Sequence, residues 1–187
     1  MFFVVGLGNP GAKYARTRHN VGFEAVELLR ERHGLAPFAE RKKCLVSRGR
    51  LDANDVMLAL PQTYMNLSGD AVAPLVRFYK GEPSRLVVVH DELDFDPGRV
   101  GVKTGGGHGG HNGLRSIINH LGRDFVRVRI GVGKPPDPRR GADFVLSRFT
   151  PQERQQVDEA LHTAADAVLS VVQLGPAEAM SRFNRRG

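Results

Sequence analysis

Val-Val-Gly-Leu-Gly-Asn-Pro-Gly, residues 4 to 11, decides how the fold is interpreted, because an apolar run leads here into three spaced glycines. The pattern Gly-x-Gly-x-x-Gly is typical of dinucleotide-binding loops when a helix opens within the glycines and an acidic residue follows about 20 positions later. Here Pro10 delays the helix, and apolar spacing predicts it from Asn20, a suitable N-cap, onward. No predicted strand ends in a carboxylate at the required distance. The stretch therefore indicates a strand followed by a tight turn and disfavours a nucleotide site.

Strands and helices alternate along the remaining sequence. Apolar runs and two-residue alternation predict strands, whereas apolar residues three and four apart predict helices. The order indicates an α/β fold, a three-layer sandwich with a mostly parallel, mixed central sheet flanked by helices. Because the chain has 187 residues, 41% of them hydrophobic, we expect a single domain over 1–187. Strands are predicted at 2–5, 44–50, 56–60, 86–90, 99–103 and 125–131, helices at 20–32, 67–79, 112–121, 151–174 and 176–183, and an exposed loop at 133–141.

The charge of the chain points to a polyanionic partner. Twenty-seven Lys and Arg residues face 20 Asp and Glu residues, which gives a net charge of +7. Nucleic acid is the commonest partner of such a surface, although the same excess also serves solubility. Cys44 is the single cysteine, which excludes an internal disulfide and fits a reducing cytoplasm. We expect neither a signal peptide nor a transmembrane segment, because no apolar run is long enough.

Polar side chains collect directly after several predicted strands. Parallel strands bring their carboxyl ends to one edge of the sheet, where α/β folds bind ligands. A glycine-rich segment, Gly105–Gly113, also precedes a predicted helix, and its glycines allow backbone to approach a bulky substrate. We therefore expect a site at this edge, formed by Asn9, Tyr14 and His19 after the first strand, Tyr64, Met65 and Asn66 after the strand at 56–60, and His90, Asp91, Glu92 and Asp94 after the apolar run at 86–89.

His19 and Asp91 are the candidate catalytic pair. Imidazole is the side chain best matched to general-base work near neutral pH, and an acidic partner fixes its tautomer. The alternative for His19 is a surface histidine at a helix start, and for Asp91 an ordinary loop carboxylate. The chain lacks a Gly-x-Ser-x-Gly elbow, and Cys44 lies in a predicted strand, so no side-chain nucleophile is indicated.

Metal binding is an alternative interpretation of the same residues. Asp91, Glu92 and Asp94 form a carboxylate cluster of the kind that binds magnesium. His108 and His111 are spaced as a loose zinc-ligand pair, which lacks a third ligand of the usual motifs. We favour a site without metal or cofactor.

Several polar residues have both a structural and a functional interpretation. Asn112 and Asn66 precede predicted helices and suit an N-cap, with Ser68 as a competing cap for the second, but their amides equally suit binding of a peptide-like group. Tyr14 either stacks on a base or packs. Basic residues near the glycine-rich segment are most often solvated, yet their joint placement suits phosphate contacts. They are Arg99, Lys103, Arg127, Arg129 and Lys134.

Four segments together resemble the bacterial peptidyl-tRNA hydrolase family. The resemblance covers essentially the whole chain, and four motifs in the same order are far more specific than one. The segments are Gly-Leu-Gly-Asn-Pro-Gly at 6–11 with Tyr14 and Thr-Arg-His-Asn at 17–20, Pro-Gln-Thr-Tyr-Met-Asn-Leu-Ser-Gly at 61–69, His-Asp-Glu-Leu-Asp at 90–94, and Gly-Gly-Gly-His-Gly-Gly-His-Asn-Gly at 105–113.

This resemblance implies an enzyme that hydrolyses the ester between peptide and tRNA and so recycles tRNA released from stalled ribosomes. It implies a cytoplasmic monomer without metal or cofactor, with peptidyl-tRNA as its partner and no membrane contact. In the family pattern His19 is the general base that activates water, and Asp91 orients it. The implied substrate-binding residues are Asn9, Tyr14, Tyr64, Met65, Asn66, His111 and Asn112, and the implied tRNA phosphate-binding residues are Lys103 and Arg129.

One position departs from the family pattern. Members can carry two lysines at alternating positions before the glycine segment, whereas here the first is Gly101 and only Lys103 remains, with Arg99 nearby as a substitute. A non-catalytic RNA-binding relative is a second hypothesis. Such a protein is expected to lose the base–carboxylate pair, which this chain retains in His19 and Asp91.

Overall fold

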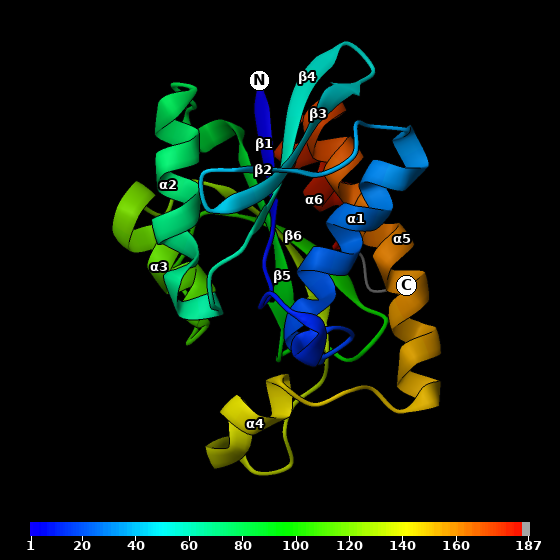
Figure 1. Ribbon diagram of the computed structural model, residues 1–187. Coiled ribbons are helices and arrows are strands. Elements are labelled where there is room, and N and C mark those ends of the chain that lie inside the picture. The colour runs from blue at the N-terminus through cyan, green and yellow to red at the C-terminus, as the bar shows by residue number, and fades with distance from the viewer. Residues whose placement is uncertain (185–187) are drawn as a thin grey trace.

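The strands of the computed structural model form one mixed sheet in the order β2-β3-β4-β1-β5-β7-β6 (Figure 1). The structure describes residues 1–184. The four central strands run parallel, while β2 and β3 at one end and β6 at the other pair antiparallel. This is the mixed sheet that the sequence predicts. Its strands are β1 (Phe2–Gly6), β2 (Ala39–Arg41), β3 (Cys44–Leu51), β4 (Asn54–Pro61), β5 (Leu86–Glu92), β6 (Val100–Thr104) and β7 (Val126–Gly131).

Helices cover both faces of the sheet and complete the expected three layers. One face carries α2 and α3, and the other carries α1, α5 and α6 (Figure 1). Each face has its own apolar core, because a central sheet must bury both sides. The short α4 projects beyond these layers at the bottom of Figure 1. The helices are α1 (Val21–His33), α2 (Ser68–Phe78), α3 (Asn112–Leu121), α4 (Gly141–Val145), α5 (Pro151–Leu174) and α6 (Pro176–Phe183).

The side chains of β1 show why this strand lies at the centre. Val4 packs into the core below α1 and α5, whereas Phe3 and Val5 pack into the core below α2 and α3, and all three are almost completely buried. A strand covered on both faces is apolar at every position rather than at every second one. Because β4, β1, β5 and β7 are parallel, their carboxyl ends share one edge of the sheet.

Two glycines allow α1 to cross the end of β1. A Cβ atom on Gly6 would stand 2.4 Å from the carbonyl oxygen of Gly22, and one on Gly22 would stand 2.3 Å from that of Val89. Neither position has room for a side chain. The helix begins only at Val21, well beyond Gly11, so no helix opens within the glycines. The opening stretch is therefore a packed turn, as the sequence indicates.

Two elements were not predicted from the sequence. The edge strand β2 is short and exposed throughout, so it lacks an apolar signal. The predicted loop at 133–141 contains a 3-10 turn at Pro138–Arg140 and leads into α4. By contrast, the bounds of α3, α5 and α6 agree with the prediction. No helix within residues 1–184 is long and apolar enough to cross a membrane.

The side chains that were expected to cap α1 and α2 form no capping hydrogen bond. Asn20 occupies the N-cap position of α1, but its side chain bonds the backbone of Asn9 instead of the helix. At α2 neither Asn66 nor Ser68 caps, and the Ser68 hydroxyl donates to the carbonyl of Met65. Both helices are entered through a 3-10 turn, whose own hydrogen bonds take the place of a side-chain cap.

Candidate active site

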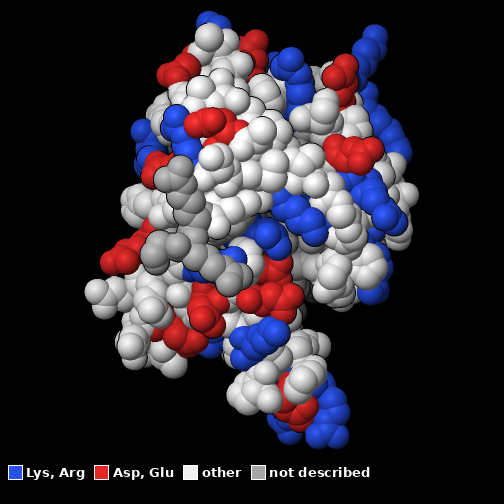
Figure 2. Space-filling view, turned by 180° about the vertical axis from the view of Figure 1, so that it is seen from behind, with Lys and Arg blue, Asp and Glu red and all other residues white. Residues whose placement is uncertain are grey.

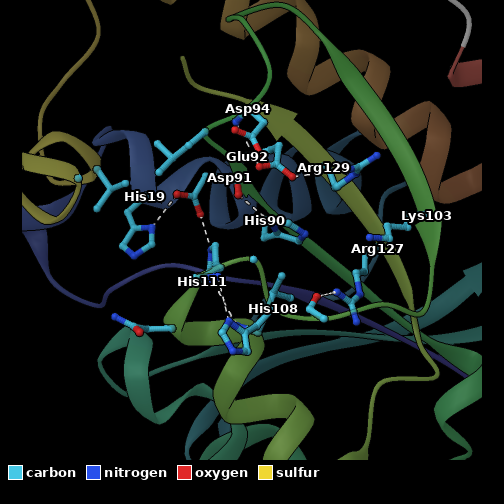
Figure 3. A pocket seen from close by; sticks show the side chains of 18 of the residues that line it. His19, His90, Asp91, Glu92, Asp94, Lys103, His108, His111, Arg127 and Arg129 are labelled. Atoms are coloured by element: carbon cyan, nitrogen blue, oxygen red, sulfur yellow. Dashed lines mark hydrogen bonds and ion pairs between the residues drawn. The ribbon is translucent and has the colours of Figure 1, made fainter. Parts of the chain in front are cut away.

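A cavity of about 680 Å³ opens at the sheet edge where β5 and β7 end (Figure 3). Its walls come from these two strands, from β6, from the glycine-rich segment before α3 and from α4. The cavity brings together six predicted site residues: His19, Asp91, His111, Asn112, Lys103 and Arg129. The other predicted residues lie outside its lining: Asn9, Tyr14, Tyr64, Met65 and Asn66.

Asp91, near the end of β5, joins two histidines (Figure 3). Its Oδ2 lies 2.7 Å from Nδ1 of His19, and its Oδ1 lies 2.7 Å from Nε2 of His111. The side chain of Asp91 is 2% exposed, so solvent is almost completely excluded from its hydrogen bonds. The chemistry of the residues predicts the first pair. The second pair depends on how the glycine-rich segment folds back over β5, which residue chemistry alone does not reveal.

The hydrogen-bond partners determine where the ring protons lie. A carboxylate only accepts hydrogen bonds, so Nδ1 of His19 carries a proton, and its Nε2 has no partner within residues 1–184. Nδ1 of His111 accepts from the backbone N–H groups of Gly113 and Leu114, so its proton lies on Nε2 and faces Asp91. Of the two rings, only that of His19 keeps a lone pair free for a substrate or water.

Burial and charge act in opposite directions on this cluster. Burial lowers the pKa of His19. The negative charge of Asp91 and the hydrogen bond to it together raise this pKa by more than burial lowers it, so the pKa lies above its ordinary value of 6.5. Burial raises the pKa of Asp91, but His19 and His111 outweigh burial and hold the pKa well below its usual range. Asp91 therefore stays ionised, and His19 is a base suited to near-neutral pH.

His111 also caps α3, where the sequence suggested Asn112. The lone pair on its Nδ1 replaces the side-chain oxygen of an ordinary N-cap. The helix cap thereby holds the ring that supports Asp91. The amide of Asn112 is left exposed and without a hydrogen-bond partner within the described residues.

His90 is a neutral residue packed beneath this cluster. It is 2% exposed, and burial, with a further contribution from neighbouring His111, lowers its pKa to about 3. Its Nδ1 donates to the backbone carbonyl of Asp91, and its ring meets the His111 ring edge to face with centroids 5.1 Å apart. His90 therefore supports Asp91 and His111 from within the protein and brings no charge into the cavity.

Asn9 ties the turn after β1 to the turn after β4. Its backbone N–H donates to Oδ1 of Asn20 at 2.9 Å, and its own Oδ1 accepts from the backbone N–H of Met65 at 2.7 Å. The sulfur of Met65 in turn lies against Gly113 in the first turn of α3. Nδ2 of Asn9 remains without a partner within residues 1–184. The opening turn is thus fixed to two other elements of the site.

Asn112 also lines a second, shallower cavity of about 210 Å³. Asn66 lines the same cavity, and its exposed side chain forms no hydrogen bond within the described residues. Tyr64, 59% exposed, meets the ring of Tyr14 edge to face with centroids 6.3 Å apart. Asn66 and Asn112, both predicted to bind substrate, therefore share one polar surface that continues from the main cavity.

The end of the main cavity farther from His19 carries positive charge (Figure 3). Lys103 is exposed and forms no ion pair within residues 1–184. Arg129 lies 3.5 Å from Glu92 and stacks on the ring of Phe95 at 4.6 Å. The two residues thus offer one free cation and one that is held in place by neighbours.

Arg127 has a structural role that its sequence position did not indicate. It is 2% exposed, and its two terminal nitrogens donate to the carbonyls of Gly106 and Gly107. Its guanidinium therefore holds the glycine-rich segment against β7, and these hydrogen bonds occupy the groups that a phosphate contact would need.

Phe95 explains why position 101 carries no lysine. A Cβ atom on Gly101 would stand 2.8 Å from the Phe95 ring, which fills the space beside β6. Arg99 stacks on the same ring at 3.9 Å and does not line the cavity. The structure therefore gives no support to Arg99 as a substitute for the missing lysine.

The carboxylates and histidines that the sequence offered as alternative metal ligands have other partners in the structure. The three carboxylates of the predicted magnesium cluster each have separate cationic or histidine partners: Asp91 with the two histidines, Glu92 with Arg129, and Asp94 with Lys134. Among residues 1–184, His108 belongs to no group of potential metal ligands, and its Nδ1 accepts a hydrogen bond from the backbone N–H of Gly110. His19, Asp91 and His111 do form a group of metal-ligand type within the described residues. In that group, a hydrogen-bonded proton lies between Nδ1 of His19 and Asp91 and another between Nε2 of His111 and Asp91, so these nitrogens act as donors to the carboxylate.

Arg18, the residue before His19, anchors the segment that carries α4. Its guanidinium donates to the carbonyl of Val132 at 2.7 Å, to the Ser147 hydroxyl at 3.0 Å and to Glu153, and it stacks on Phe144 at 4.2 Å. Residues of α4 form part of the cavity wall. These partners lie more than a hundred residues away along the chain, so the sequence pattern gave no sign of them.

Comparisons with known proteins agree with this geometry. The family model described as peptidyl-tRNA hydrolase matches residues 3–187. Peptidyl-tRNA hydrolase of Chloroflexus aggregans is 50% identical over 186 residues, which is 98% of this chain and 99% of that protein. The Mycobacterium tuberculosis protein of the same name is 49% identical over 97% of this chain and 96% of its own. The crystal structure of peptidyl-tRNA hydrolase from Acinetobacter baumannii superposes with a TM-score of 0.94 at 43% identity, covering 98% of this chain and 94% of that one. The chain therefore belongs to the peptidyl-tRNA hydrolase family and is an ester hydrolase of peptidyl-tRNA.

Proposed function

We propose that His19 is the general base of this hydrolysis and that Asp91 orients and polarises it. The 2.7 Å hydrogen bond between His19 Nδ1 and Asp91 carries this proposal, because it leaves Nε2 free on a ring that lines the cavity. Nε2 takes a proton from water as the water oxygen attacks the ester carbonyl carbon. Asp91 stabilises the imidazolium that forms. The proton then passes to the departing ribose oxygen, which leaves the peptide with a carboxyl group.

Three asparagines are proposed to bind the reacting group and the peptide. Attack on the ester places negative charge on the carbonyl oxygen, which needs preorganised hydrogen-bond donors. Nδ2 of Asn9 and the side-chain amide of Asn112 have no protein partner within residues 1–184 and suit this role. Asn66, with Asn112, offers further hydrogen bonds to the peptide along the second cavity. Met65 supports the site through its backbone hydrogen bond to Asn9 and the contact of its sulfur with Gly113. Tyr14 and Tyr64 offer aromatic surface to the tRNA end.

The same donors explain a preference for peptidyl over free aminoacyl groups. Asparagine amides pair well with the peptide bond next to the ester. A free ammonium cannot replace that amide, and its desolvation in a partly buried site costs binding energy. Binding of the peptide bond therefore selects the substrate without any contact to a particular side chain.

Lys103 and Arg129 are proposed to bind phosphate at the far end of the cavity. Their charge complements the nucleic-acid part of the substrate, while the uncharged donors near His19 suit the ester. We further propose that the chain acts as a monomeric single domain in the cytoplasm, without metal or cofactor, and recycles tRNA released from stalled ribosomes. The match to the peptidyl-tRNA hydrolase family supports the tRNA-recycling part of this proposal.

Hydrolysis of a matched substrate pair tests the proposal. One tRNA carries an N-acetylated amino acid and the other carries the same amino acid with a free amino group. We expect rapid release from the acetylated tRNA in the presence of a chelator, and at least about 100-fold slower release from the free one. Equal rates on both would contradict the proposed role of the asparagines, and loss of activity on chelation would contradict the absence of a metal.

A further inference from the structure

A patch of cations and aromatic rings lies at the outer end of α2, where it meets the turn between β2 and β3. The guanidinium of Arg41 lies 5.2 Å from the ring centroids of both Phe78 and Tyr79. The ammonium of Lys42 lies 4.6 Å from the first ring, and the guanidinium of Arg48 lies 5.4 Å from the second. We call these five residues the β2–α2 patch. Nothing in the proposed reaction uses them.

The charge of the β2–α2 patch is not neutralised by the protein. Within residues 1–184, none of its three cations forms an ion pair with a carboxylate. Two exposed arginines elsewhere do have acidic partners, Arg50 with Asp55 and Arg182 with Glu178. Three further basic residues, all exposed, flank the patch: Lys43, Arg77 and Lys80. This part of the surface therefore has a local excess of positive charge.

One aromatic ring of the patch is also accessible. Phe78 is 57% exposed, which is unusual for a large apolar side chain, and all three cations are exposed. Cations bind phosphates, and exposed aromatic or guanidinium planes stack on unpaired bases, so this combination matches the surface of a folded RNA. An acidic protein surface matches the charge but makes less use of the exposed ring.

The position of the patch excludes contact with the reacting end of the substrate. α2 begins directly after Asn66, beside the second cavity, and ends at Phe78. Eleven helical residues span about 16 Å, so the patch lies roughly that far from the peptide-binding surface. Figure 2 shows Lys and Arg side chains along the rim of the molecule that carries α2 and α3, at the right of that view.

We propose that the β2–α2 patch binds the folded body of the tRNA while the ester lies in the main cavity. This proposal rests on the proposed function, because it takes tRNA as the ligand. It predicts that whole tRNA binds through the patch and that a short oligonucleotide with the same 3′ end does not reach it. The patch then contributes to affinity and to discrimination of whole tRNA from short RNA, without touching the reacting atoms.

The test compares two double variants that each remove two exposed arginines. Arg41→Ala with Arg48→Ala alters the patch, and Arg50→Ala with Arg182→Ala removes arginines that have acidic partners. Binding of deacylated whole tRNA is measured over a range of salt, together with KM for an N-acetylated aminoacyl-tRNA and for a short N-acetylated aminoacyl oligonucleotide. Phe78→Ala is measured in the same way to separate stacking from charge.

The patch variant should weaken whole-tRNA binding and raise the KM for whole substrate by about tenfold, with a salt slope smaller by about two. It should leave the KM for the short substrate unchanged, as should the control variant for both substrates. Unchanged tRNA binding in the patch variant would overturn the proposal, as would equal effects on the long and short substrates. Because tRNA binding is measured without turnover, failure of the wild type to hydrolyse either substrate would contradict the proposed function and not the patch.

Discussion

At the scale of single residues, the site depends on what each histidine contacts with its second ring nitrogen. His19 and His111 both donate to the same carboxylate at 2.7 Å. The second nitrogen of His111 accepts from two backbone N–H groups of α3, whereas that of His19 is free. Two identical side chains on one aspartate therefore have different roles, one as a support and the other as the proposed base.

The pH dependence of kcat/KM should report the pKa of His19. The base works only when neutral, so the rate should fall as the pH drops through a pKa that Asp91 raises above 6.5. In Asp91→Asn the raising charge is gone and burial remains, so the inflection should move to lower pH and the rate should fall. Glu92→Gln is the control, because that carboxylate faces Arg129. An inflection at the same pH in wild type and Asp91→Asn would contradict the assignment.

At the scale of elements, the cavity wall formed by α4 depends on Arg18. The side chain reaches residues before and after α4, and its hydrogen bond lowers the pKa of Glu153, which also completes the capping box of α5 with Thr150. Backbone hydrogen bonding of Arg18 to Ser147 adds a second link. The segment carrying the proposed base and the segment carrying α4 are therefore held together.

Arg18→Met should loosen this wall as well as the fold. Removing one partner of a mostly buried ion pair destabilises a protein by about 3 kcal/mol, measured here by urea unfolding. Arg154→Met is a matched control, because Arg154 forms a similarly buried pair with Glu24. Its contact nearest to α4 is with the ring of Phe149, just outside residues 141–148. Only Arg18→Met should raise KM and speed amide hydrogen exchange at 141–148. Equal changes in both variants would show that Arg18 contributes stability alone.

At the scale of the whole molecule, parallel strands bring distant segments of the chain to one sheet edge. This rule placed His19 and Asp91 together from the sequence, and glycine and apolar patterns predicted the layers around them. Local patterns did not predict which residue caps α3, because an asparagine beside a histidine looks like the better cap. They also did not predict the Arg127 and Arg18 contacts, which depend on tertiary packing and on partners far away in the chain.

Salt dependence tests how the net charge of +7 is used. Lys103→Ala should chiefly raise KM for an N-acetylated aminoacyl-tRNA, because the ammonium lies at the far end of the cavity from His19. Loss of one phosphate contact should reduce the slope of log(kcat/KM) against log salt by about one. Lys134→Ala, which removes an exposed lysine paired with Asp94, is the control. A slope that is the same in wild type and Lys103→Ala would exclude that contact.

Single-turnover hydrolysis by His19→Ala tests the central claim most directly. Wild type and variant are mixed in excess with N-acetylated aminoacyl-tRNA, and release of the amino acid is followed while binding of deacylated tRNA is measured in parallel. Loss of a general base costs about 100- to 10,000-fold in rate, so we expect a decrease in that range with tRNA affinity nearly unchanged. A variant rate within about threefold of wild type, at equal tRNA binding, would contradict the role of His19 as the base.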